Sequence, residues 1–402
     1  MKRKKVLMVM TQMMGGGAER VAAQIMNKLN ERGYDTRFVL TRARKQDVVR
    51  TDLNEKTELI LLTEELKKET AAQKVLHLPA RAYSTILGKL YEKQDKYVPA
   101  SVGKATIEWQ YHREIAWLRS YMKQNPDMTV IVFLQPSIPM VLLAAQGLPN
   151  KVIISERGNP NNIFKKRYGW GFMKKYYPSA HKIVFQTKFA QERFPKVVAE
   201  KGVVIKNPLK EGLPEPYIGS RNHDITTFCR IHPDKDLMTL LKAFHRLYKE
   251  YPDYKLKIIG DAKTANEVQC KQELLDYVDK NKLENAVVFQ PFSDNVHREI
   301  IRDAMYVNSS VTEGLCNAML EAMAICMPVV CTDCPIGGAR DTIENEVNGL
   351  LVPVRDDKAL YLAMKKVIED EILSNSISNN AASIRTQLSL DRIVDQWEQA
   401  MQ

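Results

Sequence analysis

Apolar and polar residues alternate along the first half of the chain in the pattern of short strands and helices. Residues 5–10 are an apolar run, and residues 15–17 are glycines. Apolar residues then repeat at helical spacing, at Val21, Ile25, Met26 and Leu29. This pattern predicts a strand, a turn and a helix over 18–32. Further strands are expected at 36–40, 129–134, 151–155, 182–186 and 203–205, with a mostly helical, polar stretch at 64–123.

The second half repeats this alternation with greater regularity. Residues 207–223 are rich in proline and glycine and have no hydrophobic period, which predicts a linker. After it, strands are expected at 225–228, 255–259, 286–290, 306–309, 328–332 and 349–352, and helices near 236–250, 265–281, 296–304, 317–325, 356–370 and 390–402. Alternating strands and helices indicate an α/β protein with parallel sheets. We therefore predict two Rossmann-like β/α/β domains, 1–206 and 207–385, facing a ligand cleft.

Length and composition agree with two ordinary globular domains. A chain of 402 residues usually forms more than one domain. The sequence has no apolar run near the ~20 residues that span a bilayer. The apolar run at 6–10 is too brief for the core of a signal peptide. Six cysteines in such a chain fit a reducing compartment without a disulfide framework. The expected location is the cytoplasm.

The charge is unevenly distributed. Residues 1–200 contain 35 Lys and Arg against 18 Asp and Glu, whereas residues 201–402 contain 24 against 30. A basic first half suits an anionic partner such as a membrane leaflet, a lipid diphosphate or nucleic acid. A basic surface that is merely solvated explains the same charge equally well.

Two glutamates, Glu313 and Glu321, stand eight positions apart in the stretch EGLCNAMLEAMAICMPVVCTD. The first precedes an expected helix and the second lies within it, and a strand follows. Such a unit presents acidic groups to a ribose and helix N–H groups to phosphates. A capping box at 310–313 is the alternative interpretation, since Ser-x-x-Glu commonly begins a helix.

The spacing of these glutamates resembles the Glu-x₇-Glu motif of the retaining family 4 glycosyltransferases, in particular the branch that builds capsular and cell-surface polysaccharides. The resemblance covers nearly the whole second half. It implies that Glu321 binds the ribose hydroxyls of a nucleotide-sugar donor and that Glu313 lies by the donor sugar and diphosphate. It also places the donor near Gly314, Leu315, Cys316 and Asn317. The implied fold is the two-domain GT-B fold, with a terminal helix at 386–402 crossing back to the first domain.

Arg230 and Lys235 follow the first strand of the second half and resemble the Arg and Lys of that family's phosphate-binding element. Two fixed cations suit a departing diphosphate, because they stabilise the charge that develops on it. With Glu313, they are the expected catalytic residues. We expect neither a cofactor nor a metal: the acids at 234 and 236 lie inside this cationic element, and Cys331-x-x-Cys334 lacks a second ligand pair. Cys229 and Cys326 stand where the family usually has glycine.

The first half carries two weaker motifs. Gly16 and Gly17 resemble the Gly-Gly-x-Glu-Arg turn of the same family, which admits the donor or acceptor close to backbone N–H groups. A dinucleotide fingerprint is not satisfied, because Arg20 stands where it requires glycine. Glu156 and Arg157 end an expected strand and resemble a Ser-Glu-Arg segment of the polysaccharide branch. They are candidates for the acceptor or sugar pocket in place of the histidine of many relatives, and a structural ion pair is the alternative.

Residues 163–177 combine five cations with six aromatic residues. Such a mixture suits a membrane interface, and it also suits a helix whose aromatic side chains pack inward. A second candidate for membrane contact is the helix expected at 81–97. The interfacial interpretation predicts peripheral contact with the inner face of the plasma membrane.

Taken with the resemblance, the sequence predicts transfer of a sugar from a nucleotide diphosphate, with a UDP-sugar as the expected donor, to a hydroxyl of a glycan or lipid-linked oligosaccharide. A sugar-nucleotide 2-epimerase of the same fold is the alternative enzyme. A nucleic-acid-binding module is the alternative outside enzymes, although the chain has no helix-turn-helix, zinc-finger or RNP-type motif.

Overall fold

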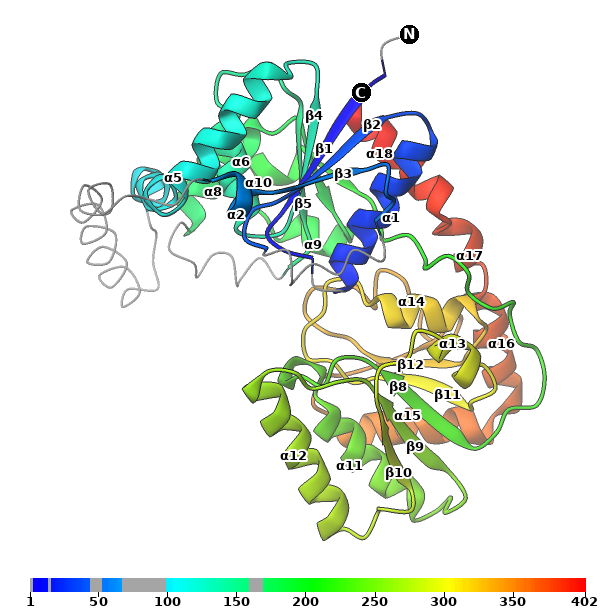
Figure 1. The fold of residues 1–402 in the computed structure, drawn as a ribbon. Coiled ribbons are helices and arrows are strands. Elements are labelled where there is room, and N and C mark those ends of the chain that lie inside the picture. The colour runs from blue at the N-terminus through cyan, green and yellow to red at the C-terminus, as the bar shows by residue number, and fades with distance from the viewer. Residues whose placement is uncertain (1–2, 14–15, 44–52, 67–98, 159–168) are drawn as a thin grey trace. The chain divides into compact units, whose positions relative to one another are not determined.

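The protein folds into two compact α/β units, described here from a computed structural model (Figure 1). The structure describes residues 3–13, 16–43, 53–66, 99–158 and 169–402. The N-terminal unit comprises Met1–Lys206 together with Leu390–Gln402, and the C-terminal unit comprises Asn207–Ser389.

The N-terminal unit is built on a parallel sheet of seven strands in the order β3-β2-β1-β4-β5-β6-β7. The strands are short and largely buried, as expected for a parallel sheet covered on both faces. Their bounds are β1 Lys5–Met10, β2 Asp35–Leu40, β3 Glu58–Leu61, β4 Thr129–Phe133, β5 Val152–Glu156, β6 Lys182–Phe185 and β7 Gly202–Val204.

Helices cover both faces of this sheet. On one face lie α5 Ala100–Gln124, α6 Ser137–Ala144 and α8 Gly169–Tyr176, which pack on one another (Figure 1). On the other lie α1 Gly17–Glu31 and α18 Leu390–Met401. Shorter helices are α2 Leu62–Glu65, α9 Lys188–Glu192 and α10 Lys196–Ala199. Trp397 of α18 is fully buried with its ring 5.6 Å from that of Phe133.

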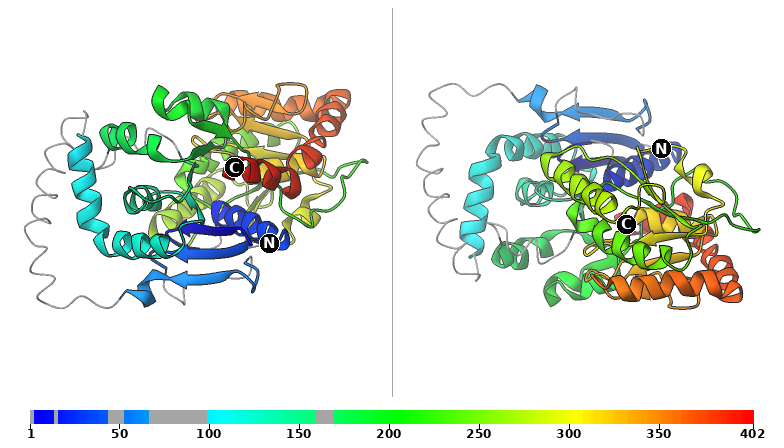
Figure 2. Two further views of the ribbon diagram at one scale, coloured as in Figure 1. Left: turned by 90° about the horizontal axis from the view of Figure 1, so that it is seen from above. Right: turned by 90° about the horizontal axis from the view of Figure 1, so that it is seen from below.

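Ion pairs join α18 to α1. Arg32, directly after α1, bonds Asp391, Asp395 and Glu398, and Lys28 pairs with Asp391. The blue and red helices lie side by side in both views of Figure 2. The last helix is thus part of the N-terminal unit, although it follows the C-terminal unit in sequence.

The C-terminal unit contains a parallel sheet of six strands in the order β10-β9-β8-β11-β12-β13. The bounds are β8 Asp224–Phe228, β9 Lys255–Ile259, β10 Val287–Gln290, β11 Met305–Asn308, β12 Val329–Thr332 and β13 Leu350–Val352. The helices are α11 Leu237–Tyr248, α12 Ala265–Lys280, α13 Val296–Ile300, α14 Asn317–Ala324, α15 Asp357–Glu369, α16 Glu371–Ala381 and α17 Ile384–Gln387. From the middle of the sheet, β8, β9 and β10 follow one another toward one edge. β11, β12 and β13 follow one another toward the opposite edge.

The strand order therefore reverses between β8 and β11, which are hydrogen-bonded neighbours. In open α/β sheets, ligands bind outside the carboxyl ends of the strands at such a switch point. The loops that follow Phe228 and Asn308 are the ones that this topology places there.

Candidate functional site

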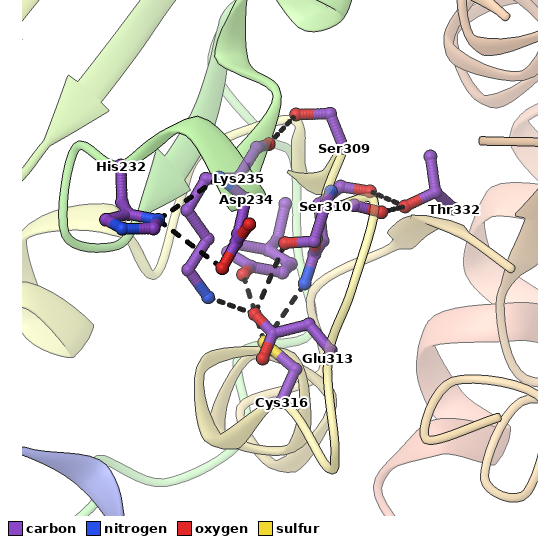
Figure 3. A network of polar contacts seen from close by, with 10 residues as sticks. His232, Asp234, Lys235, Ser309, Ser310, Glu313, Cys316 and Thr332 are labelled. Atoms are coloured by element: carbon purple, nitrogen blue, oxygen red, sulfur yellow. Dashed lines mark hydrogen bonds and ion pairs between the residues drawn. The ribbon is translucent and has the colours of Figure 1, made fainter. Parts of the chain in front are cut away.

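An ion pair between Lys235 and Glu313 lies at the switch point of the C-terminal unit. Lys235 ends a short 3-10 turn after β8, and Glu313 lies in the loop between β11 and α14. The ammonium group bonds carboxylate Oε1, and the two side chains retain 21% and 18% of their exposure. Figure 3 shows the lysine pointing from its loop toward the glutamate. The pair is thus largely covered and still open to solvent on one side.

The charge of Glu313 keeps Lys235 protonated. Burial by itself lowers the pKa of Lys235, but the adjacent carboxylate outweighs this effect and raises the pKa above its usual value. A lysine in this state is a permanent cation at neutral pH. It can exchange the carboxylate for a more highly charged anion such as a diphosphate.

Hydrogen bonds hold the two loops in register around this pair (Figure 3). Ser309 Oγ donates to the Lys235 carbonyl at 2.8 Å, and Ser310 Oγ donates to Glu313 Oε1 at 3.2 Å. Thr332, at the end of β12, donates to the Ser310 carbonyl at 2.6 Å. Contacts from three adjacent strand ends thereby fix the position of Glu313. This is the preorganisation that electrostatic catalysis requires.

The capping-box interpretation of residues 310–313 is wrong. Helix α14 begins only at Asn317, with Cys316 as its N-cap, and Ser310 bonds the side chain of Glu313 instead of a helix N–H.

Cys316 Sγ accepts a hydrogen bond of 3.0 Å from Asn308, and burial raises the pKa of its thiol. Gly314 and Leu315 therefore form a turn before the helix. Asn317 Oδ1 accepts a hydrogen bond from Asn207 at 2.6 Å.

A second loop presses against this turn. A Cβ atom on Gly338, in the loop between β12 and β13, would stand 1.8 Å from the Gly314 carbonyl oxygen. Only glycine allows such an approach. The loop after β12, the paired-glycine segment at 337–338, thus contacts the turn that carries Glu313.

Arg230 lies in the same β8–α11 connection but has a different partner. Its Nε lies 3.3 Å from Oε1 of Glu267, and 66% of the arginine side chain is exposed, against 3% for the glutamate. Glu267 also accepts from the backbone N–H groups of Lys263 and Thr264, which lowers its pKa. Sequence reasoning missed Glu267, although the Thr264-x-x-Glu267 capping box was a local signal for its place at the start of α12.

Glu321 is buried inside α14, where its carboxylate meets a histidine. His297 Nε2, on α13, lies 2.8 Å from Glu321 Oε2. Sequence reasoning missed His297 as well, and no local pattern marks it. Its ring also packs edge-on against Phe228, the last residue of β8, with centroids 5.5 Å apart.

The residues singled out in the N-terminal unit lie at the carboxyl ends of its strands. Gly16 is the N-cap of α1, its N–H bonds Glu19 Oε2 at 2.9 Å, and Gly17 is the first residue of the helix. Glu156 ends β5 and accepts from the Tyr177 hydroxyl at 2.5 Å and from Gln135 at 3.0 Å. These bonds hold the Glu156 carboxylate within its own unit.

Arg157 is buried beside Glu156. Its Nε donates to Ser155 Oγ at 3.1 Å, and its guanidinium lies 4.0 Å from the centre of the Phe133 ring. Burial lowers the pKa of Arg157. Both side chains have contacts within the N-terminal unit, so the structure places them under the surface at the end of β5.

The other polar candidates are engaged locally. Asp236, in left-handed conformation at φ 44°, accepts from Thr239 at the start of α11, and the Asp234 carboxylate lies beside His232. Cys331 and Cys334 are buried thiols whose pKa is raised by burial. In the described part of the chain, no three His, Cys, Asp or Glu residues are grouped as metal ligands.

Part of the aromatic and basic segment 163–177 lies outside the described residues, as does the whole of 81–97. In the described part, Phe172, Tyr176 and Tyr177 are buried in the core, whereas Lys174 and Lys175 are exposed. These three rings pack inward, whereas Lys174, Lys175 and the half-buried Trp170 keep part of their surface accessible. Within the described ranges, no helix has the length and apolar character needed to cross a bilayer.

Comparison with known proteins indicates the class of this protein. Residues 218–384 match the family model for glycosyl transferases group 1. Two Campylobacter jejuni N-acetylgalactosaminyltransferases, named for substrates linked to diphospho-undecaprenol, are each 26% identical to the chain. The alignments cover 63% of this chain and 70% of one relative, and 76% of this chain and 85% of the other. A capsular polysaccharide glycosyltransferase, CapM of Staphylococcus aureus, is 25% identical over 62% of this chain and 59% of its own.

Among solved structures, Anabaena HepE in complex with UDP superimposes with a TM-score of 0.74 at 18% identity, covering 99% of both chains. TarM superimposes with a TM-score of 0.73 at 12% identity, over 99% of this chain and 98% of its own. These likenesses establish the two-domain GT-B fold. The family match and the named relatives show that the chain is an enzyme of the glycosyltransferase class.

Proposed function

We propose that this enzyme transfers a sugar from a UDP-sugar, with retention at the anomeric carbon, to a hydroxyl of a glycan or lipid-diphosphate-linked oligosaccharide. The setting proposed is cell-surface polysaccharide synthesis, in the capsular branch of family 4. The names of the Campylobacter and Staphylococcus relatives support the acceptor class. The UDP complex of HepE supports the donor.

The observation that carries this proposal is the Lys235–Glu313 pair at the switch point of the C-terminal unit. A donor diphosphate bound there meets a protonated lysine, and Arg230, which is mostly exposed, lies in the same β8–α11 connection. As the bond between the anomeric carbon and the diphosphate oxygen breaks, negative charge grows on the leaving group. Fixed cations stabilise that charge most in the transition state.

The acceptor hydroxyl attacks on the face from which the diphosphate leaves. A bond forms between the acceptor oxygen and the anomeric carbon, and the hydroxyl proton passes to the leaving diphosphate. In this scheme Glu313 holds Lys235 and shapes the donor pocket, and it forms no covalent bond to the sugar. The two cations balance the diphosphate charge, so the scheme requires neither a metal nor a cofactor.

The remaining candidates receive supporting roles in this proposal. Gly314, Leu315, Cys316 and Asn317 border the donor phosphates, and Glu321 binds the ribose. Gly16 and Gly17 contact the donor, and Glu156 and Arg157 contribute to the sugar or acceptor pocket. The basic N-terminal unit contacts an anionic membrane at the cytoplasmic face, where a lipid-linked acceptor is presented.

A donor panel tests the proposal directly. Thermal unfolding is measured with UDP, GDP, ADP and CDP, because a ligand that binds only the folded state raises the midpoint with occupancy. UDP should give the largest shift, and UDP-sugars are then assayed with a diphosphate-linked acceptor, with the product anomer assigned by NMR. Inversion would contradict the retaining step. Conversion of UDP-N-acetylglucosamine without any acceptor would instead identify an epimerase.

A further inference from the structure

The buried pair formed by His297 and Glu321 is the feature that the proposed transfer chemistry does not use. The His297 Nε2 and Glu321 Oε2 atoms are 2.8 Å apart, and only 6% and 4% of the two side chains are exposed. An ionised carboxylate can only accept a hydrogen bond, so Nε2 of His297 carries the proton and donates it. The imidazole therefore fixes one oxygen of Glu321 in place.

Placing these two polar groups in the interior is costly. A buried carboxylate destabilises the fold unless hydrogen bonds replace its lost water, and a charged pair often contributes less than apolar residues of the same size. The chain nevertheless places a histidine opposite the glutamate. A requirement for stability alone would be met more simply by two apolar side chains, which points to a role in recognition.

The histidine itself is held from a third element. His297 lies on α13, Glu321 lies on α14, and the ring of Phe228 at the end of β8 stands edge-on to the imidazole at 83°. Phe228 in turn contacts Tyr306 of β11, with ring centroids 5.0 Å apart. The imidazole thus contacts the end of β8 and the helix that carries the glutamate, and Phe228 is itself packed against β11. Its position can change little without moving the site.

We infer that His297 is a positioning residue that fixes the carboxylate of Glu321 for the hydroxyls of the donor ribose. A carboxylate has about four lone-pair sites, so a bond from His297 leaves acceptor capacity for ligand hydroxyls. Through Glu321, His297 sets how strongly the site prefers a ribonucleotide to a deoxyribonucleotide. This inference rests on the proposed function, because it takes Glu321 as the group that meets the ribose.

The test is a ratio of affinities measured by titration calorimetry. UDP, 2′-deoxy-UDP and 3′-deoxy-UDP are titrated into wild type, His297→Leu, His297→Phe and His297→Gln, with Glu321→Ala as reference. Leucine and phenylalanine both remove the N–H group that donates the hydrogen bond to Glu321. Phenylalanine also keeps an aromatic ring against Phe228, so it serves as the test if the leucine variant does not fold. Glutamine restores an N–H donor. The matched control is His245→Leu. His245 lies on α11, and its Nδ1 is 3.2 Å from the Tyr277 hydroxyl.

Wild type should prefer UDP to at least one deoxy analogue, and Glu321→Ala should abolish that preference. Losing a charge-assisted hydrogen bond to Glu321 should reduce the preference about tenfold in His297→Leu and His297→Phe. His297→Gln should recover most of it, and His245→Leu should leave it unchanged. A merely structural histidine would weaken UDP and the deoxy analogues by the same factor, and that result would overturn the inference.

Two failures are distinguishable. If wild type binds no UDP, the proposed donor is wrong and this inference falls with it. Suppose that wild type prefers UDP through Glu321, but His297→Leu and His297→Phe keep the full preference. The proposal of a UDP-sugar donor then stands, and the role of His297 is rejected.

Discussion

Lys235 and Glu313 form an ion pair from the ends of two neighbouring strands. The carboxylate thus bonds the same ammonium group that a donor diphosphate would bind. Glu313 is the partner of a lysine whose pKa burial alone would lower. On donor binding, the diphosphate becomes a competing partner for the same ammonium group. The ion pair therefore keeps Lys235 protonated before the diphosphate binds.

Replacing Lys235 by alanine should lower kcat by about 10²-fold or more, since the lost charge acts most strongly as the diphosphate leaves. The dissociation constant for UDP should rise less than kcat falls, because the ground state carries less charge at the breaking bond. Steady-state kinetics and calorimetry measure the two effects. Lys365→Ala, which removes a lysine of the exposed α15 surface, is the control. An unaltered rate in Lys235→Ala would remove this lysine from the leaving-group role.

The raised pKa of Lys235 makes a second prediction, on stability as a function of pH. A lysine whose pKa is higher in the folded than in the unfolded state contributes stability fully below its unfolded pKa of about 10.4. That contribution is lost as the pH rises above this value toward the folded pKa. The difference in unfolding free energy between wild type and Lys235→Met, from urea titrations, should thus stay constant from about pH 7 to 9.5 and shrink above about 10.4. A difference that shrinks below pH 9 would contradict the assignment.

Several strands of the C-terminal unit could be predicted closely because each contains apolar residues that are buried in the sheet. β8, β9 and β12 begin and end within a residue of the expected bounds. β3 was missed, because an apolar run as short as 59–61 cannot be told from a helix segment by its periodicity alone. α16 was missed because its asparagines and serines are poor helix formers, and its packing against neighbouring elements decides its structure.

The candidate site divides in the same way. Lys235 and Glu313 were singled out through the family resemblance, and the structure shows that they follow neighbouring strands. His297 and Glu321 are 24 positions apart on different helices, and only tertiary packing brings them together. Arg230 is expected to act with Lys235, and in the structure its Nε lies 3.3 Å from Glu267, a partner that depends on where α12 begins.

Activity should persist in the presence of a chelator. If Lys235 and Arg230 balance the charge of the diphosphate, no divalent cation is needed for departure of the leaving group. Turnover is measured in excess EDTA, and again after adding back Mg²⁺ or Mn²⁺. Abolition by EDTA with recovery on adding metal would show that a cation takes part.

Binding to anionic vesicles should depend on the basic segment near α8. Lys174 is exposed, and charge reversal at Lys165, Lys166 and Lys174 should reduce sedimentation with vesicles containing anionic lipid, with a contribution of about 1 kcal/mol per cation near the surface. Added salt should weaken the wild-type interaction in the same direction. Charge reversal at Lys280, Lys282 and Lys358 of the C-terminal unit is the control. Full retention by the first variant would remove this segment from membrane contact.

Cys326 occupies a backbone conformation that favours glycine. It follows the end of α14 with φ at 60°, and the Cys326 and Met327 N–H groups bond the carbonyls of Met323 and Ala322. This is the Schellman arrangement, whose first residue beyond the helix is usually glycine. A side chain in the left-handed region costs roughly 1 kcal/mol. Cys326→Gly should therefore raise the free energy of unfolding by up to about that amount. The larger conformational entropy of glycine in the unfolded chain reduces this gain.

The matched control for this substitution is Cys326→Ala, which removes the thiol but keeps the Cβ and therefore the strain. Urea denaturation followed by circular dichroism should rank glycine above both cysteine and alanine, with an unchanged denaturant slope. The Cys326 side chain is buried, so loss of its packing opposes the gain; both variants lose the Sγ, and glycine also loses the Cβ. If alanine and glycine give the same stability, the positive φ carries no cost at this position, and the cysteine is retained for its packing.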